Sequence, residues 1–374
     1  MAFGSSKVVV AGHVCLDILP AFESRHGGPE LLSSPGALVE VGPAVLSTGG
    51  AVSNTGLALH RLGIPTRLMG KLGDDLFGRA VREIIDRQGP GLSRDMLVEP
   101  GADTSYSVVI SPPGVDRIFL HCPGANDTFA ADDVPYDSIA EGTLFHFGYP
   151  PLMRRMYADG GDELAVMLRK VRQRGAAASL DMARPDPAAE SGRVDWAALL
   201  ARALPEVELF LPSIDEILFM LDRPRYDRLS GGGDLASRVD RALLHDVSGR
   251  LLDLGAALVV LKLGHRGLYV RITPQARRLA PLERVAGRSL GAWAGRELHA
   301  PCFEVQVRGT TGCGDRTIAG FLAGLCRGQT LDEAVTSAVA VGACSVEAGG
   351  GEVPAWEAVQ TRIASGWPRR TTVL

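Results

Sequence analysis

Short runs of apolar, mostly β-branched residues recur along the chain and tend to end in glycine or in a polar residue. The first run, at residues 7–12, reads KVVVAG. Four similar runs follow further along the chain, at residues 144–147, 178–182, 208–211 and 257–261. Apolar runs of this length are typical of strands that are buried on both faces, so they predict the strands of a parallel sheet.

Amphipathic helical patterns lie between these runs, for instance at residues 163–174 and 196–204. Another strand is expected at 66–70, and a helix rich in Ala and Val is expected at 331–347. Strands that alternate with helices form βαβ units. The pattern therefore predicts an α/β fold, in which helices cover both faces of a mostly parallel sheet.

Two regions rich in Gly, Pro and Ser break this alternation. Each contains two short strand-like runs around a turn: residues 38–41 and 44–46 around Gly42-Pro43, and residues 105–110 and 117–121 around 112–114. We expect the two antiparallel pairs to join as one small sheet, a lid formed by residues of about 20–47 and 103–122. A lid that excludes water would protect a reaction for which water competes.

Composition narrows the class of protein further. Of the 374 residues, 46% are hydrophobic and 22% are charged, which is a globular balance. The net charge of −4 gives no general attraction to nucleic acid or to a membrane surface. The N-terminus has no signal-peptide core, and no apolar run approaches 18 residues. The six cysteines are scattered without a C-x-x-C pair. We therefore expect free thiols in the cytoplasm and no cysteine metal site.

Polar residues follow several of the predicted strands. Asp17 comes shortly after the first strand, where it could hold substrate hydroxyls or simply form a turn. The later strands are followed by Asp181 and Arg184, by Ser213 and Glu216, and by Lys262 with Gly264 and Gly267. Because the carboxyl ends of parallel strands meet at one edge of the sheet, these residues predict one active-site crevice.

Two glycine-rich segments precede helices. In GGAVSNTGLALHRLG, Gly49 and Gly50 would let a ligand approach the backbone, and Asn54 could cap the helix or bind a sugar hydroxyl. In RGTTGCGDRTIAGFLAG, a glycine-rich turn leads into a helix, whose free N–H groups and dipole suit an anion such as phosphate. Asp315, in the first turn of that helix, is either a helix cap or a base that takes a proton from an attacking hydroxyl.

The spacing of Gly309 and Gly314 is also that of a Walker-type phosphate loop. That loop continues with Lys and then Ser or Thr, whereas this chain continues with Asp315 and Arg316. Since no lysine is present to reach the terminal phosphates, we reject a Walker-type loop.

Taken together and in this order, the motifs resemble those of the ribokinase-like, PfkB-type carbohydrate kinase family. The resemblance covers nearly the whole chain, and the GTTGCGD segment followed by Ala, Gly and Phe is its most specific part. It implies a single kinase domain over residues 1–374, built as a three-layer α/β/α sandwich with a β lid. It also implies transfer of the ATP γ-phosphoryl group, with Mg²⁺, to a hydroxymethyl group of a sugar or related alcohol.

The resemblance implies a role for each motif. Asp315 matches the catalytic base, and the backbone N–H groups of Gly312, Cys313 and Gly314 match the hole that stabilises charge on the transferring group. The sugar-binding positions match Asp17, Gly49, Gly50 and Asn54. Glu216 matches a glutamate near the magnesium and its waters. The nucleotide-binding positions match Lys262, Gly264 and Gly267, and Ala343 and Ala348 are expected near the adenine.

The chain departs from the family pattern in four places. Ser213 replaces the Asn of the family's Asn-x-x-Glu motif, three residues before Glu216. Gly309 replaces an Asp associated with a bound monovalent cation, which is evidence against such a cation here. Arg316 replaces a small residue. A cation in a first helical turn opposes the dipole, so we expect an anionic partner, either a structural ion pair or a substrate phosphate or carboxylate. Residues 271–299 are longer than the family needs, and we interpret them as a solvated hairpin extension in preference to a nucleotide-covering segment.

Two other functions stay open. A nucleoside kinase of the same fold would need an aromatic stacking group in the lid, which offers only Tyr106 and Phe119. A sugar-binding regulator that has lost catalysis would account for Ser213, Gly309 and Arg316. The sequence does not identify the sugar, and no cluster of Lys and Arg around Asn54 marks a sugar phosphate. Exposed lid strands could support a homodimer through the lid.

Overall fold

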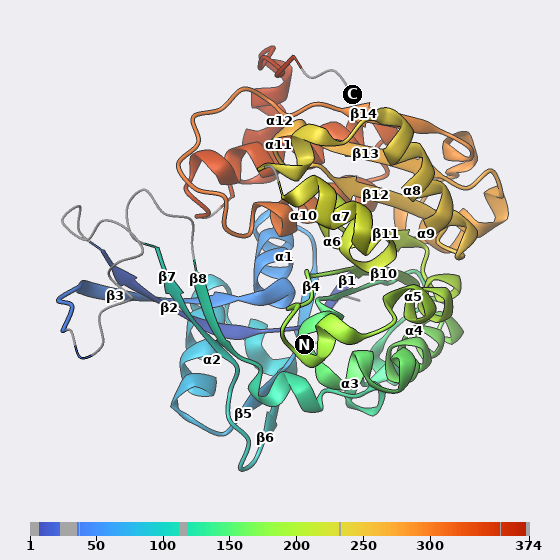
Figure 1. Cartoon of the computed structure of the whole chain (residues 1–374). Coiled ribbons are helices and arrows are strands. Elements are labelled where there is room, and N and C mark those ends of the chain that lie inside the picture. The colour runs from blue at the N-terminus through green and yellow to red at the C-terminus, as the bar shows by residue number, and fades with distance from the viewer. Residues whose placement is uncertain are drawn as a thin grey trace.

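The computed structural model describes residues 7–22, 36, 38–111, 118–231, 233–351 and 353–371. Its central feature is an eight-stranded sheet of order β14-β13-β12-β11-β10-β9-β1-β4 (Figure 1). These strands are β1 (Val8–Gly12), β4 (Thr66–Met69), β9 (Leu144–Gly148), β10 (Ala177–Asp181), β11 (Leu209–Phe210), β12 (Leu258–Lys262), β13 (Leu268–Ile272) and β14 (Glu297–Ala300). The pairs from β4 to β12 are parallel, and only β13 and β14 join antiparallel. The predicted mostly parallel sheet is confirmed.

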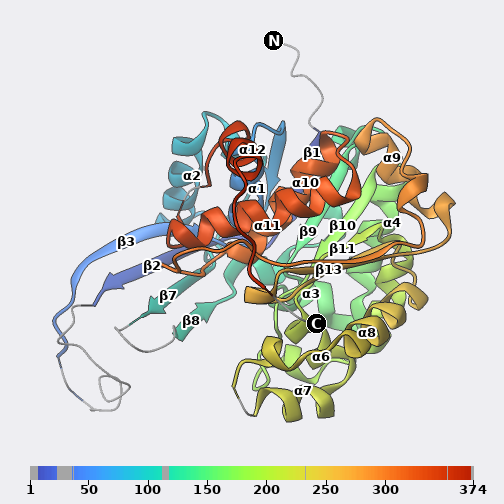
Figure 2. The ribbon, with the colours of Figure 1, turned by 90° about the horizontal axis from the view of Figure 1, so that it is seen from above.

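Helices cover both faces of this sheet, as Figure 2 shows from above. One face packs against α1 (Gly50–Arg61), α2 (Leu76–Gln88), α9 (Ala280–Ala286), α10 (Cys313–Cys326), α11 (Leu331–Glu347) and α12 (Trp356–Ala364). The other face packs against α3 (Arg154–Tyr157), α4 (Asp162–Gln173), α5 (Trp196–Ala203), α6 (Ile214–Leu221), α7 (Arg223–Ser230) and α8 (Arg241–Asp253). The layers form the expected three-layer α/β/α sandwich.

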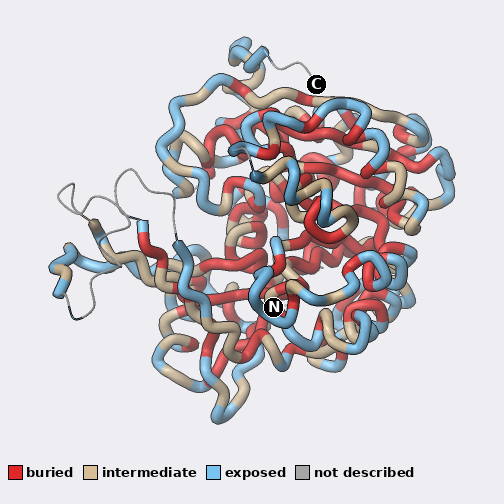
Figure 3. The backbone as a smooth tube through the Cα atoms, viewed as in Figure 1, coloured by how far each residue is buried: buried red, intermediate tan, exposed pale blue. Residues whose placement is uncertain are grey.

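Alternation along each strand divides the core between the two faces. In β1, Val8 and Val10 point into the first layer, whereas Val9 and Ala11 point into the second. Successive side chains of a strand point to opposite faces, so a strand with a helix layer on each side must be apolar throughout. This is why the strands appear as continuous apolar runs in the sequence, and why the buried residues fill the interior in Figure 3.

A second sheet projects from the sandwich and forms the lid (Figures 1 and 2). Its order is β3-β2-β7-β8, with β2 (Cys15–Ala21), β3 (Gly42–Gly49), β7 (Tyr106–Ile110) and β8 (Ile118–Cys122). The expected small sheet is present, and β7 pairs antiparallel with β8 as predicted. The turn at 112–114 and Arg117 lie outside the described residues.

The expected strand pair in the first lid segment is wrong. Residues 38–41 form no strand, and Gly42-Pro43 is not a turn but the start of β3. The partner of β3 is β2, which pairs antiparallel with it so that Leu16 faces Thr48 and Ile18 faces Leu46. Asp17 therefore lies inside a lid strand rather than in a loop after β1.

Residues 271–299 do not form a solvated hairpin extension. Between β13 and β14 the chain makes helix α9 and two short 3₁₀ turns, and it buries Leu279, Leu282, Val285 and Trp293 in the core. The Arg278 guanidinium donates to the carbonyls of residues 205, 207 and 255. Those carbonyls precede β11 and β12, so the insertion covers the amino-terminal edge of the sheet, away from the predicted crevice.

A small two-stranded sheet, β5 (Lys71–Gly73) and β6 (Leu97–Glu99), completes the strands named here. All six cysteines are free. In the part of the chain that the structure describes, no helix is long and apolar enough to cross a membrane.

Candidate active site

The N-terminus of α10 is the centre of the site. The preceding residue, Gly312, has φ of +64°, a left-handed conformation that glycine adopts without strain. A Cβ there would also lie 2.7 Å from the Arg316 guanidinium and 3.2 Å from the Asn54 side chain. The glycine thus permits the tight turn that brings residues 309–312 against α1.

The Asp315 carboxylate does not cap its own helix. No side chain caps α10, and the Asp315 residue is 3% exposed. Asn54 Nδ2 donates to Asp315 Oδ2 at 3.0 Å, and Tyr149 Oη lies 2.6 and 2.7 Å from the two carboxylate oxygens. Since both partners come from other elements, the helix-cap interpretation of Asp315 and of Asn54 loses its support.

Tyr149 is a site residue that the sequence did not reveal. It follows β9 with φ of +70°, unusual for a residue with a side chain. Burial, together with the charges of Asp315 and Asp181, raises the pKa of Tyr149 well above its usual range, so the phenol stays protonated and donates to Asp315. Its place directly after a sheet strand is the same signal that identified Asp181 and Lys262.

A charged cluster lies beside Asp315. Lys262 Nζ pairs with Asp181 Oδ1 at 2.7 Å, and the Asp181 side chain is fully buried. Burial raises the pKa of Asp181 and of Glu216, although Lys262 opposes both shifts. Burial alone would lower the pKa of Lys262, but the charges of Asp181, Glu216 and Asp315 outweigh it and raise that pKa. Three carboxylates therefore share one ammonium group.

Ser213 and Glu216 form a capping box at the start of α6. The backbone N–H of Ser213 donates to Glu216 Oε2 at 2.7 Å. One carboxylate oxygen of Glu216 is thus engaged with its own helix. The cavity next to this helix, of about 710 Å³, is lined by Ser213 and Glu216 together with Tyr149, Lys262 and Asp315.

The predicted sugar-binding residues lie together in a second cavity of about 760 Å³, which Asp315 also lines. Asp17, Gly49, Gly50 and Asn54 all border it. A Cβ at Gly49 would lie 2.4 Å from Asp17 Oδ2, so only glycine leaves room for that carboxylate. Burial raises the pKa of Asp17 to about 6, although hydrogen bonds from Cys15 and Ser107 oppose the shift.

Two histidines in this cavity were also missed. His13, just after β1, and His121, on lid strand β8, bring their Nε2 atoms to 3.4 Å. Burial, helped by His121, lowers the pKa of His13 to about 3, and burial lowers that of His121. Both rings are therefore neutral near pH 7, and they join the lid to the sandwich at the sugar cavity.

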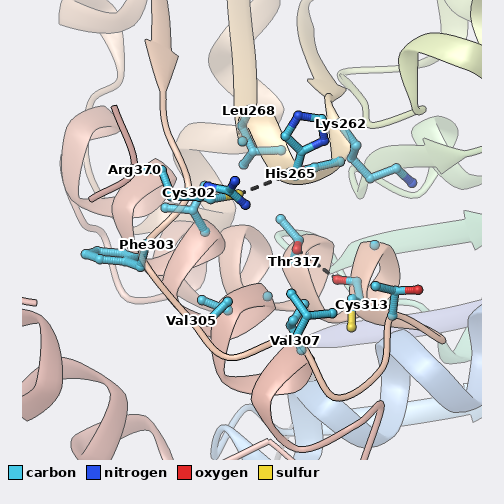
Figure 4. A pocket seen from close by; sticks show the side chains of 18 residues that line it. Lys262, His265, Leu268, Cys302, Phe303, Val305, Val307, Cys313, Thr317 and Arg370 are labelled. Atoms are coloured by element: carbon cyan, nitrogen blue, oxygen red, sulfur yellow. Dashed lines mark hydrogen bonds between the residues drawn. The ribbon is translucent and has the colours of Figure 1, made fainter. Parts of the chain in front are cut away.

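A third, apolar cavity of about 250 Å³ begins where the first ends. Figure 4 shows its lining side chains, among them Lys262 and Cys313. The predicted nucleotide residues Gly264, Gly267 and Ala343 line it as well. Ala348 does not, because it is exposed at the C-cap of α11. The first cavity shares Lys262, Gly264 and Gly314 with the third, and Tyr149, Gly312 and Asp315 with the second. The three cavities therefore follow one another past the tip of α10.

Two departures from the family pattern find structural reasons. Among the described residues, the hydrogen-bond partner of the Arg316 guanidinium is the Thr311 carbonyl, at 2.8 Å, so Arg316 ties the glycine turn to the helix. The expected structural ion pair is therefore wrong, and a substrate phosphate or carboxylate as the partner of Arg316 stays a prediction. At Gly309, a Cβ would lie 2.7 Å from the carbonyl oxygen of Gly349. An aspartate would not fit there unless the two segments moved apart.

The family model of the pfkB family carbohydrate kinases matches residues 5–358. The chain belongs to this family. An uncharacterized sugar kinase of Archaeoglobus fulgidus is 26% identical over 277 residues, which are 74% of this chain and 89% of that protein. Fructokinase-1 of Zea mays is 30% identical over 152 residues, but the match spans only 40% of this chain and 43% of the maize protein.

Solved structures show the same fold for this PfkB-family kinase. A fructokinase with bound ATP from Xylella fastidiosa has a TM-score of 0.71 at 17% identity, covering 96% of this chain and 99% of that one. Arabidopsis thaliana ribokinase, complexed with ribose and ATP, has a TM-score of 0.67 at 17% identity over 96% and 98% of the two chains. The ribokinase-like fold is thereby confirmed. Family membership makes the protein an ATP-dependent carbohydrate kinase.

Proposed function

We propose that Asp315 is the general base of this sugar kinase. The observation that carries the proposal is the buried Asp315 carboxylate, which Asn54 and Tyr149 hold at the border between the sugar cavity and the charged cluster. A hydroxymethyl oxygen of the sugar attacks the γ-phosphorus of ATP, its proton passes to Asp315, and the bond from the γ-phosphorus to the bridging oxygen breaks. ADP and a sugar phosphate result.

The turn before α10 would stabilise the charge that develops during transfer. Among the described residues, the backbone N–H groups of Gly312 and Gly314 have no hydrogen-bond partner, and the Cys313 N–H donates to the Thr310 carbonyl at 3.3 Å. Free amides at a helix N-terminus are fixed donors that need no reorganisation when negative charge builds up. These three amides are therefore the proposed anion hole.

The charged cluster fits a magnesium ion brought in by ATP. Asp181, Glu216 and Asp315 outnumber Lys262, and Asp181 Oδ2 is buried without a hydrogen-bond partner among the described residues. Mg²⁺ commonly keeps several waters and binds one or two carboxylates plus substrate phosphates, so a dedicated cage is not required. Asp181 and Glu216 are the proposed holders. When bound, the ion neutralises charge on the β- and γ-phosphates.

The lining of the sugar cavity favours a neutral sugar. The carboxylates of Asp17, Asp127 and Asp186 border it, and Arg184 is the one Lys or Arg among the described lining residues. Carboxylates accept hydrogen bonds from sugar hydroxyls but repel a phosphate. A nucleoside is less well supported, because only one of the two lid aromatics, Phe119, lines the cavity, and Tyr106 packs against Phe77 instead.

We also propose one kinase domain that dimerises through its lid. The lid exposes Val45, Leu46, Phe119 and Leu120, each at least half exposed. A cluster of exposed apolar side chains on edge strands is typical of a protein interface. Sedimentation of the wild type beside a Leu46→Lys, Leu120→Lys variant tests it: a dimer should become a monomer.

The function can be tested by measuring how fast the enzyme consumes ATP with each of a panel of ketoses, aldoses, sugar acids and nucleosides. The Asp315→Asn variant is measured in parallel. We expect the best turnover with a neutral sugar and a loss of about 10²- to 10⁴-fold in kcat for the variant. Binding of ATP and sugar should persist, since the replacement is isosteric. An Asp315→Asn enzyme with wild-type kcat would disprove the base assignment, and a wild type that binds sugar without turning over would favour the sugar-binding regulator.

A further inference from the structure

The C-terminal segment of this chain lies outside the match to the family. The match to the family model ends at residue 358, and residues 368–370 turn back to pair with residues 302–304. Glu304 N–H donates to the Pro368 carbonyl at 2.9 Å, and Arg370 N–H donates to the Cys302 carbonyl at 2.8 Å. Backbone bonds thus fix the tail on both sides of Arg369.

Side chains hold the tail in this position. The Trp367 and Phe303 rings stack with centroids 4.4 Å apart, and Trp367 Nε1 donates to the Glu304 carbonyl at 2.9 Å. The Arg369 guanidinium lies 4.5 Å from the Phe303 ring centroid and donates to the Pro301 carbonyl at 3.0 Å. The position of the next residue, Arg370, is therefore determined by an ordered framework.

Arg370 lines the apolar cavity that the predicted nucleotide-binding residues Gly264, Gly267 and Ala343 also line, and for this reason we place ATP in it. In Figure 4 its guanidinium lies beside Cys302 and extends toward His265, and Lys262 lies beyond His265. The opposite wall is apolar and includes Phe303, Val305 and Val307.

The other basic side chains that line this cavity are already close to acids. Lys262 pairs with Asp181 at 2.7 Å, and His265 Nδ1 lies 3.2 Å from Asp234. For Arg370, no ion pair or side-chain hydrogen bond is present among the described residues. A triphosphate that entered this cavity would meet one guanidinium whose donors are unused.

We propose that Arg370 is a nucleotide-binding residue whose guanidinium contacts the phosphate chain of ATP. Guanidinium groups suit phosphate oxygens because they offer several N–H donors in one plane and keep their charge at any physiological pH. The inference rests on the proposed position of ATP in this cavity. It adds to the nucleotide site a residue from a segment of this chain that lies beyond the match to the family model.

The test compares Arg370→Ala and Arg370→Lys with the wild type. Arg277→Ala is the matched control, because Arg277 is exposed on the insertion at the far edge of the sheet. For Arg370→Ala we expect the Kd and KM of ATP to rise about tenfold, with kcat and the sugar KM within twofold and the melting temperature unchanged. Arg370→Lys should recover part of the affinity, and Arg277→Ala should behave as the wild type.

A comparison of the Kd values for ATP, ADP and adenosine shows which part of the nucleotide Arg370 contacts. Kd values for ATP and ADP should rise in Arg370→Ala, whereas that for adenosine should not, and added salt should shrink the difference. An unchanged ATP Kd overturns the proposal. An equal loss for adenosine also overturns it, because the guanidinium would then contact the base and not the phosphates.

A second variant separates this inference from the placement of ATP. Val305→Trp should fill the apolar cavity from a loop and abolish ATP binding. If ATP binds Val305→Trp as well as it binds the wild type, the nucleotide lies elsewhere and the placement itself fails. If Val305→Trp loses ATP but Arg370→Ala does not, only the role of Arg370 is wrong.

Discussion

The two edges of the central sheet both bury an acid beside a cation, yet only one edge has the features of an active site. At the amino-terminal edge, Glu208 is fully buried, accepts from the Ala178 N–H at 2.8 Å and pairs with Arg172 at 3.1 Å. At the carboxyl-terminal edge, Asp181 is fully buried and pairs with Lys262 at 2.7 Å. Burial raises the pKa of both acids.

The difference lies in the balance of charge and in what surrounds it. Around Glu208, the Arg278 guanidinium and the α9 insertion close the edge, and neither Glu208 nor Arg172 lines any of the three cavities described above. Around Asp181, carboxylates outnumber ammonium groups, and cavities open on both sides of the cluster. A buried ion pair by itself therefore indicates little about function, whereas an unbalanced cluster that faces a cavity is a candidate site.

The largest expected effect comes from breaking each pair in turn. Lys262→Met should lower kcat/KM by about 10²-fold or more, because a cation near the transferring group is lost. It should also lower the free energy of unfolding by about 3 kcal/mol, because Asp181 is left buried without its partner. Arg172→Met should lower the free energy of unfolding but leave kcat/KM within threefold. Steady-state kinetics and urea unfolding measure both quantities.

Double variants, in which both members of a pair are replaced, test the same difference between the two edges of the sheet. Asp181→Asn with Lys262→Met should regain stability without regaining activity, since the pair is neutralised but the cation is still missing. Glu208→Gln with Arg172→Met should regain stability and stay active. If Arg172→Met lost as much activity as Lys262→Met, the proposed distinction between the two edges would be wrong.

The second largest effect is expected when a hydrogen-bond donor to Asp315 is removed. Tyr149→Phe removes the phenol that lies 2.6 and 2.7 Å from the Asp315 oxygens. We expect kcat to fall about tenfold, which is the worth of one hydrogen bond to a charged group, while both KM values change less than twofold. Tyr136→Phe is the control, because that phenol donates to the Ala131 carbonyl at 2.7 Å, away from the site. A tenfold rise in the sugar KM with unchanged kcat would instead make Tyr149 a sugar-binding residue.

The five central strands of the sandwich, β1 and β9 to β12, were predictable because they are buried on both faces. The runs at 144–147 and 257–261 agree with β9 and β12 to within one residue, and the helix at 331–347 agrees with α11. Lid strands lack that double burial, so β2 mixes Asp17 and Pro20 with apolar residues and was missed. In the insertion, Leu279, Leu282 and Val285 recur at helical spacing, but the surrounding arginines concealed this pattern.

The site was predictable where a polar residue follows a strand or a glycine. This rule identified Asp17, Asn54, Lys262 and Asp315 as candidate site residues from the sequence. It missed Tyr149 because an aromatic residue between a strand and two prolines looks like part of the core. It could not assign Arg370, because nothing in the local sequence indicates that the tail returns to the nucleotide cavity.

The smallest expected effect concerns pH, and it compares two acids whose pKa values burial has raised. Asp17 has a pKa of about 6 in the folded chain against an ordinary value of 3.8. Between these values the folded state holds more protons than the unfolded state, so the contribution of Asp17 to stability falls as pH rises from about 4 to about 6. Glu208 should act in the same direction, since its pKa is raised as well.

Of these two acids, only Asp17 should affect how the sugar KM depends on pH. If its carboxylate accepts hydrogen bonds from sugar hydroxyls, the sugar KM should rise a few-fold as pH falls from 7 to 5, and Asp17→Asn should remove most of this dependence at the cost of a higher KM throughout. Glu208→Gln should leave the pH profile of the sugar KM unchanged, although both variants change how stability depends on pH. His13 and His121 do not compete for this explanation, because burial lowers both pKa values and keeps the rings neutral near pH 7. A wild-type sugar KM that stays flat from pH 5 to 7 would remove Asp17 from the sugar-binding residues.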